Sequence, residues 1–179
     1  MNIIRKISLL VAASVTVCLL FTACNSNDTT APMGFKEISD DGVSYDLFVP
    51  DEWTADISTG MTAAYYSGID TSNISMTAFE LTDNKILSAK DYWATYEPEL
   101  RAMFTDLSYV GEPDEITLDE APSTQYIYTG TLAGVQYKIM QIITVRNAQV
   151  YIFTYTAKVD NYDAHIEDVL AILGNFNFK

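Results

Sequence analysis

Cysteine is nearly absent from this sequence, and its scarcity limits how the chain can be stabilised. Only Cys18 and Cys24 occur among 179 residues, and Cys18 lies inside an uncharged apolar run from Ile7 to Phe21. Removal of that run as part of a signal peptide would take Cys18 with it and leave Cys24 alone. No internal disulfide can then form in the mature chain.

Basic residues are also few. Lys and Arg number 10 against 24 Asp and Glu, for a formal net charge of −14. The acidic residues are scattered over expected turns and polar faces, so they predict a solvated surface. Such a negative field argues against nucleic acid and against docking on anionic lipid headgroups, both of which attract cationic patches. A cationic or metal-bearing partner stays open as the alternative.

Familiar catalytic motifs are missing as well. The sequence contains no Gly-x-Ser-x-Gly, His-Glu-x-x-His, P-loop or dinucleotide-binding pattern. The single histidine, His165, falls beside Glu167 and Asp168 on the outer flank of the last expected helix, where we interpret it as a surface residue. Structural zinc wants four N or S ligands, and no Asp-x-Asp-x-Asp-Gly loop concentrates oxygen ligands for calcium. We therefore predict no catalytic residue, no metal site and no cofactor, and we expect that the chain is not an enzyme.

The N-terminus has the layout of an export signal. Arg5 and Lys6 precede the apolar run, whose 15 residues fall short of the roughly 20 that a spanning helix needs. The segment Leu20-Phe21-Thr22-Ala23-Cys24, which begins at the end of this run, resembles the bacterial lipobox. The resemblance implies cleavage before Cys24 and a diacylglyceryl group on its sulfur. An ordinary secretory signal with an incidental cysteine is the alternative.

We expect three segments along the chain. Residues 1–23 are the lipoprotein signal peptide, residues 24–34 are the lipidated cysteine with a flexible polar tether, and residues 35–179 are one folded domain. Two acyl chains bury enough methylene groups for stable anchoring. The domain is therefore expected at the cell membrane, lipid-anchored, on the extracytoplasmic face.

From Gly34 onward the hydrophobic pattern has period two over long stretches, which predicts β-strands. Turn residues at Asp40-Asp41-Gly42, Ala133-Gly134 and Asn147-Ala148 predict tight turns between neighbouring strands, and Gly42 is expected to supply a positive φ. The predicted strands span residues 35–39, 43–49, 63–67, 73–81, 116–118, 123–132, 135–146 and 149–157.

Two helical segments interrupt these strands. Ser88 with Asp91 forms a capping pattern before a stripe of apolar residues that reaches Leu107, and Pro98 inside it predicts a broken helix. Asp160 with Asp163 predicts a second cap, before a helix that stops at Gly174. Both faces of the strand 149–157 are largely apolar, so a further layer is expected on each side. These elements predict an α+β fold, an antiparallel β-sheet with helices packed on its faces.

Two stretches of the chain carry a resemblance to a known family. The first reads Val43-Ser44-Tyr45-Asp46-Leu47-Phe48-Val49-Pro50-Asp51-Glu52-Trp53, and it is similar to the aromatic-aliphatic-Pro-x-x-Trp opening of the PsbP-like family. The second stretch is similar to the family's closing strand, helix and tail. It consists of Tyr151-Ile152-Phe153-Thr154-Tyr155-Thr156-Ala157, a helix, and Gly174-Asn175-Phe176-Asn177-Phe178. The resemblance spans Phe35 to Lys179 and implies a PsbP-like α/β/α sandwich. It also implies a non-enzymatic role through protein contact or as an accessory subunit, and it supplies no catalytic residue.

Tyrosines are the most numerous candidates for recognition, because a phenol ring combines apolar area with a polar tip. We predict a possible binding surface at Tyr65, Tyr66, Tyr126 and Tyr128, with a place in the sheet core as the alternative for most tyrosines. The function expected is that of an accessory or protein-contact module with an unknown protein partner. A small-ligand or cation carrier is the first alternative, favoured by a pocket lined with tyrosines, and an enzyme is the second.

Overall fold

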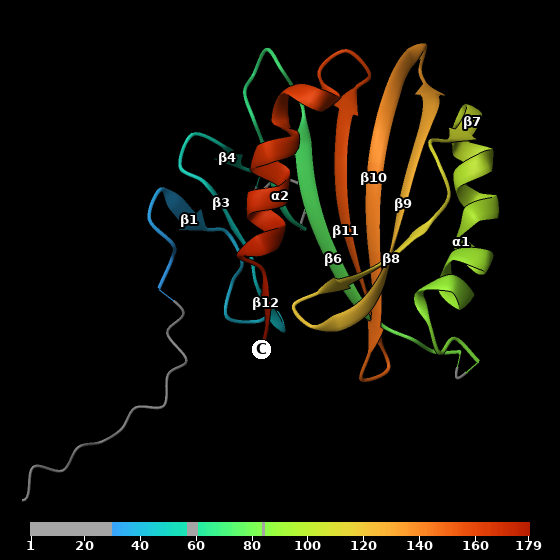
Figure 1. Cartoon of the computed structure of the whole chain (residues 1–179), viewed down its shortest axis with the longest axis horizontal. Helices are drawn as coiled ribbons and strands as arrows, with labels where there is room; N and C mark the ends of the chain where they lie inside the picture. The colour runs from blue at the N-terminus through green and yellow to red at the C-terminus, as the bar shows by residue number, and fades with distance from the viewer. Residues whose placement is uncertain (1–29, 57–60, 84) are drawn as a thin grey trace, which may run out of the picture.

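An antiparallel sheet is the centre of the computed structural model, which describes residues 30–56, 61–83 and 85–179 (Figure 1). The predicted signal peptide and Cys24 lie outside these residues. Seven strands lie side by side in this sheet. An eighth, β8 (Asp114–Leu118), pairs with residues 121–125 of β9, the part that β7 does not reach. The seven are β4 (Thr54–Ala55), β5 (Thr62–Tyr65), β6 (Asn73–Glu80), β11 (Gln149–Lys158), β10 (Val135–Arg146), β9 (Ala121–Leu132) and β7 (Thr105–Tyr109).

Tight turns connect the long strands of this sheet. Ala133-Gly134 joins β9 to β10 with φ values of +50° and +81°, and Asn147-Ala148 joins β10 to β11 with +51° and +57°. Two successive left-handed residues give the type I′ turn that matches the twist of paired strands. Both turns were predicted from the sequence. A third turn of this kind, Asp119-Glu120, joins β8 to β9.

Two small sheets replace the single hairpin predicted after Gly34. β1 (Phe35–Glu37) pairs with β3 (Phe48–Pro50), and β2 (Tyr45–Asp46) pairs with the C-terminal β12 (Asn177–Phe178). The prediction of a positive φ at Gly42 is wrong. The Gly42 amide instead donates to Asp40 Oδ1 at 2.7 Å, and a Cβ there would lie 3.0 Å from the same oxygen. Glycine is thus needed for close approach.

Helix α1 (Ala89–Met103) begins at the predicted cap. Ser88 Oγ accepts from the Asp91 amide at 3.2 Å, and Asp91 Oδ2 accepts from the Leu87 amide at 3.1 Å. The predicted break at Pro98 is wrong, because the helix continues through that exposed residue to Met103. The free energy gained by packing the residues on both sides of Pro98 exceeds the cost of the backbone hydrogen bond that proline cannot donate. The helix then ends early, and Leu107 belongs to β7, a strand that we did not predict.

The second helical segment begins differently from the prediction. A 3-10 turn, η1 (Tyr162–His165), leads directly into α2 (Ile166–Gly174), and neither segment has a side-chain N-cap. The predicted cap at Asp160 and Asp163 is therefore wrong. The predicted stop at Gly174 is confirmed.

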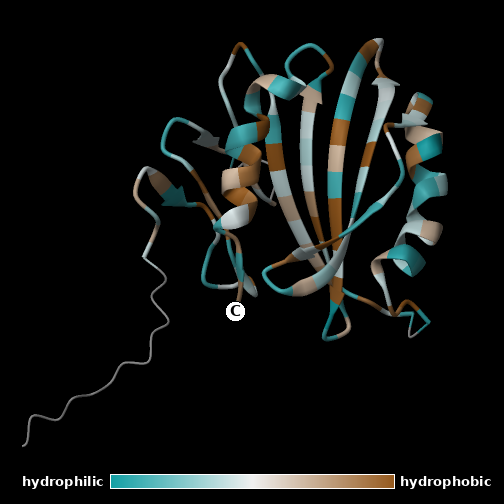
Figure 2. Ribbon diagram, viewed as in Figure 1, coloured by the Kyte–Doolittle hydropathy of each residue, from teal (hydrophilic) through white to brown (hydrophobic). Residues whose placement is uncertain are grey.

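The helices lie on opposite faces of the sheet, so each face has its own hydrophobic core. On one face Trp93 of α1 stacks on Tyr126 with ring centroids 3.9 Å apart. On the other, α2 packs together with β2, β3 and β12 over the aromatic side of β11. The banding of the central strands in Figure 2 reflects this alternation of side chains. The α+β prediction, with helices on both faces of an antiparallel sheet, is confirmed.

The two helices do not cover their faces equally. Figure 1 shows α1 at one end of the sheet, and its main contacts are with β7, β9 and β10. Phe79 near the end of β6 still contacts Tyr92 of α1, but in the described structure no helix lies over the rest of β6 or the last part of β11 on this side. The prediction that β11 is covered on both faces therefore holds for Val150 and Ile152 but not for the half-buried Thr154 and Thr156.

Candidate functional site

A groove of about 480 Å³ lies on this incompletely covered side of the sheet. We call it the α1 groove. Its floor is formed by β6, β11 and β10, and its wall by the C-terminal half of α1 together with the end of β9. The volume falls within the range of small-molecule sites, roughly 300 to 1,000 Å³.

The floor is polar because three strands place hydroxyl and amide side chains side by side. Ser75 pairs in register with Thr154, which pairs with Gln141. Tyr128 donates its phenol proton to Gln141 Oε1 at 2.9 Å, and Gln141 Nε2 donates to Thr154 Oγ1 at 3.2 Å. Gln141 is only 4% exposed, so the two hydrogen bonds are shielded from water, and they fix the position of the Thr154 hydroxyl group.

The wall is apolar. Leu100 and Met103 of α1 and Phe104 directly after it line the wall, and Leu132 at the end of β9 closes one side. Met103 is 57% exposed and Leu132 is 42% exposed, so hydrocarbon is available to a bound molecule. Gly130 permits this wall, since a Cβ at its position would lie 2.9 Å from the Cβ of Phe104. The helix end can therefore approach β9 closely only beside glycine.

Among the described residues that line the α1 groove, none is charged. Its 17 residues include hydroxyl, amide, phenol, thioether and hydrocarbon side chains, but no Asp, Glu, Lys, Arg or His. This composition contrasts with the formal net charge of −14 carried by the whole chain. The groove can offer neutral hydrogen bonds and apolar contact, but it cannot neutralise a charged ligand.

The four tyrosines predicted as a binding surface do not come together. Tyr126 and Tyr128 lie in the core at 3% and 1% exposure, and burial raises the pKa of Tyr126 to about 12. Tyr65 pairs with Asn73 and so faces the groove side, whereas the next residue, Tyr66, faces the opposite core. Only Tyr128 of the four lines the α1 groove. For Tyr126 and Tyr128 the structure fits the alternative of a place in the sheet core.

Sequence reasoning missed most of the groove, although a signal for it existed. The polar residues Asn73, Ser75 and Thr77 alternate with buried Ile74 and Met76 along β6. That alternation marks a strand with one open face. Which face stays open depends on where α1 ends, and this is not visible in the local pattern.

His165 is not on the surface, so the prediction of a surface histidine is wrong. It is 7% exposed, and its Nε2 lies 2.8 Å from Asp70 Oδ2. Its ring packs against Tyr66 with centroids 4.0 Å apart. On the other side, Asp168 accepts a hydrogen bond from Trp53 Nε1 at 3.1 Å and lies 3.9 Å from His165 Nδ1. These polar groups satisfy one another and tie α2 to the sheet.

The electrostatics of this tie depend on Asp70. Partial burial would raise the pKa of its carboxyl group, but hydrogen bonds from Ser72 and His165 outweigh this and hold that pKa well below its usual range. Both the amide and the hydroxyl of Ser72 donate to Asp70 Oδ1, at 3.0 and 2.7 Å. Asp70 is therefore held as a carboxylate.

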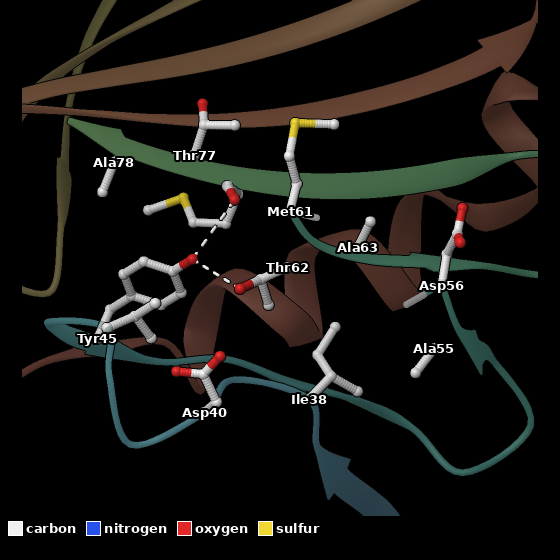
Figure 3. Close-up of a pocket in the computed structure, with 12 residues that line it drawn as sticks. Ile38, Asp40, Tyr45, Ala55, Asp56, Met61, Thr62, Ala63, Thr77 and Ala78 are labelled. Atoms are coloured by element: carbon white, nitrogen blue, oxygen red, sulfur yellow. Dashed lines mark hydrogen bonds between the residues drawn. The ribbon is translucent and has the colours of Figure 1, made fainter. Parts of the chain in front are cut away.

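A second hollow, of about 460 Å³, lies at the other side of β6 (Figure 3). Tyr45 donates its phenol proton to Thr62 Oγ1 at 2.8 Å, with a longer contact of 3.4 Å to the Met76 carbonyl. Figure 3 shows Asp40 and Asp56 at separate places along its lining. The polar group nearest its centre is thus already bonded within the protein, which leaves the α1 groove as the stronger candidate.

Two further properties concern metals and membranes. In residues 30–56, 61–83 and 85–179, no three His, Cys, Asp or Glu side chains converge where a metal ion could be held. Within the same described part of the chain, no helix combines the length and the apolar character needed to cross a bilayer.

Comparisons with known proteins establish the fold. No protein-family model matches the chain, and no curated protein matches it. Among solved structures it is similar to the cyanobacterial PsbP protein CyanoP from Synechocystis sp. PCC 6803, with a TM-score of 0.57 and 14% identity over 84% of this chain and 95% of that one. The chain has a PsbP-like fold.

Two other solved structures share this architecture. LpqN of Mycobacterium tuberculosis, described as involved in cell envelope biogenesis, matches with a TM-score of 0.54 and 14% identity over 81% of this chain and 90% of that one. A protein from Bacteroides thetaiotaomicron VPI-5482 matches with a TM-score of 0.56 and 12% identity over 82% of this chain and 49% of that one.

Proposed function

We propose that this protein is a membrane-tethered, extracytoplasmic accessory module that works by binding, without catalysis, and that the α1 groove is its binding site. The groove carries the proposal, because it combines a preorganised polar floor with an exposed apolar wall. The lipobox-like segment ending at Cys24 supports the tether. The likeness to LpqN supports a role in a cell envelope.

Binding of a small ligand is favoured over contact with a flat protein surface. Three tyrosines line the groove, namely Tyr96, Tyr128 and Tyr137. The large hydrophobic side chains exposed elsewhere on the described residues are dispersed, and Phe79 is the one aromatic ring among them. Single exposed apolar residues are normal on a protein surface and do not make a docking patch.

Binding is also favoured over catalysis. A general acid that works near neutral pH needs a carboxyl group whose pKa is raised by burial or by a like charge. In the described chain, local hydrogen bonds lower the pKa of four carboxyl groups, those of Asp70, Asp91, Glu97 and Glu115. Each of these carboxylates accepts a hydrogen bond from a separate partner, so no two of them form a pair suited to acid and base catalysis.

The test is co-purification of a small molecule with the full-length protein taken from its own membranes. Ser75 lies on the floor beside Thr154 of the central strand, so Ser75→Phe should fill the groove, and Ser108→Phe places the same ring on the exposed face of β7 as a matched control. Mass spectrometry of the extracted ligand should detect it with the wild type and with Ser108→Phe, and lose most of it with Ser75→Phe. Equal recovery from all three proteins would refute the assignment of the groove.

A further inference from the structure

We infer that the α1 groove selects an uncharged amphiphile, a molecule with hydroxyl or amide groups along one edge and hydrocarbon along the other. This inference rests on the proposed function, because it names the class of ligand for the same site. It follows from three features of the groove: the missing charge, the free hydrogen-bonding groups of the floor, and the hydrocarbon of the wall.

The missing charge is unusual for this chain. Since 19% of its residues are charged, about three of the 17 lining residues would carry a charge if charges were evenly spread. A strand face that merely meets water tolerates charged residues, as Lys158 shows at the end of β11 on the same face of the sheet. The described lining of the neighbouring groove holds none.

The floor retains hydrogen-bonding capacity for a ligand. Within the described residues, the hydroxyl groups of Ser75, Thr77 and Thr156 make no side-chain hydrogen bond, and all three are partly exposed. Thr154 already accepts from Gln141, so its own proton stays available. A hydroxyl group both donates and accepts, which suits hydroxyl, ester or amide groups on a ligand.

The wall supplies apolar contact along the same length. Met103 and Leu132 expose hydrocarbon, and Leu100 and Phe104 complete the surface behind them. A molecule lying along the groove therefore meets hydroxyl groups on one edge and hydrocarbon on the other. An entirely polar ligand would leave the wall unused, and an entirely apolar one would bury the floor hydroxyl groups without partners, at a cost in free energy.

Charged amphiphiles are disfavoured for separate reasons. An anionic headgroup finds no Lys, Arg or His among the described lining residues to replace its lost hydration, and the net negative charge of the chain also repels it. A cationic headgroup is attracted at long range but finds no carboxylate in the lining to replace its lost hydration. Selection by charge should therefore persist at physiological ionic strength, where long-range attraction is screened.

The test uses matched six-carbon probes and the mature chain, residues 24–179, carrying Cys24→Ala, which avoids detergent because it lacks both the apolar run and the lipid. Hexane-1,2-diol, hexanoate and hexylammonium are titrated at about 0.15 M salt, where long-range fields are screened, and NMR follows the backbone amides of Thr154, Thr156 and Leu132. The diol should bind at least about tenfold more tightly than either ion. Glycerol, which lacks the hydrocarbon edge, should cause no shift at these amides.

Two variants locate the binding. Ser75→Phe should abolish the diol shifts, and Ser108→Phe should leave them intact. Thr156→Val should weaken the diol about fivefold, as expected for one lost neutral hydrogen bond, and should leave hexylammonium unchanged.

The possible outcomes separate the two claims. If the ions bind as tightly as the diol and Ser75→Phe abolishes all binding, the inference about ligand class is overturned while the groove remains the binding site. If no probe shifts the groove amides and no molecule is lost from the native protein on Ser75→Phe, the proposed function fails as well.

Discussion

The buried His165 shows how much a single residue depends on a distant partner. Asp70, which fixes it, lies 95 positions earlier in the chain, in the loop between β5 and β6. Trp53 and Tyr66 complete the surroundings of the imidazole ring from two further segments. The local sequence around His165 contains acidic neighbours typical of a surface, and only the folded chain supplies the burial.

This tie predicts a measurable loss of stability in Asp70→Asn. The amide cannot accept the same charge-assisted hydrogen bonds from Ser72 and His165, so the free energy of unfolding at pH 7 should fall by about 1 to 3 kcal/mol. Urea denaturation of the wild type and of Asp114→Asn, an exposed carboxylate on β8, provides the reference. A loss in Asp114→Asn as large as that in Asp70→Asn would contradict the assignment.

The pH dependence of the same variant follows from the lowered pKa of Asp70. A carboxyl group whose pKa is lower in the folded than in the unfolded state stabilises the fold fully above its unfolded pKa, which is about 3.9 for Asp. That contribution is lost as the pH falls through the folded pKa. The stability difference between the wild type and Asp70→Asn should therefore be constant from pH 7 to 5 and shrink below about pH 4.

At the scale of elements, α1 is the helix whose length shapes the candidate site. It is capped by Ser88 as its sequence predicts, but it continues through Pro98 and ends at Met103. Trp93 on one side of Pro98 and Leu100 on the other are 6% and 3% exposed, so both turns are held against the sheet. Tertiary packing thus offsets the cost of a proline that would break an isolated helix.

Replacing this proline should stabilise the protein. Pro98→Ala restores an amide donor in the middle of α1 and removes the ring from an exposed position, so the free energy of unfolding should rise by about 1 to 3 kcal/mol. Thermal denaturation followed by circular dichroism measures the change. Pro113→Ala, at an exposed loop position, is the control and should show no gain. A fall in melting temperature for Pro98→Ala would mean that the proline is required for packing.

At the scale of the whole molecule, the fold is PsbP-like, and the proposed attachment to a membrane rests on the N-terminal sequence alone. The expected anchor is Cys24, which lies outside the described residues. The net negative charge of the chain gives no attraction to anionic headgroups, so the lipid alone would have to hold the protein on the bilayer.

Cys24→Ala tests this expectation. The variant should move from the membrane fraction to the soluble extracytoplasmic fraction, because no thiol remains to carry the diacylglyceryl group. Cell fractionation with immunoblotting measures the distribution, and the circular dichroism spectrum of the released protein should match that of the wild type. Cys18→Ala, in the apolar run, should stay on the membrane. Retention on the membrane of Cys24→Ala protein that has lost residues 1–23 would contradict lipidation as the anchor, whereas an uncleaved apolar run would itself hold the variant there.

The sequence by itself determined those features whose causes lie within a few residues. The turns at Ala133-Gly134 and Asn147-Ala148, the cap at Ser88 and the stop at Gly174 depend on local backbone conformation and local hydrogen bonds. The α+β class follows from hydrophobic periods of the same short range.

Only the tertiary structure decided the features that join distant segments. The burial of His165 depends on Asp70, and the split of the predicted hairpin depends on a C-terminal strand that pairs with β2. The α1 groove exists because α1 packs against β7, β9 and β10 and leaves the parts of β6 and β11 around Ser75 and Thr154 uncovered. A local pattern shows that Ser75 and Thr154 are polar, but the position of the helix across the sheet is a long-range packing outcome that makes them the floor of a site.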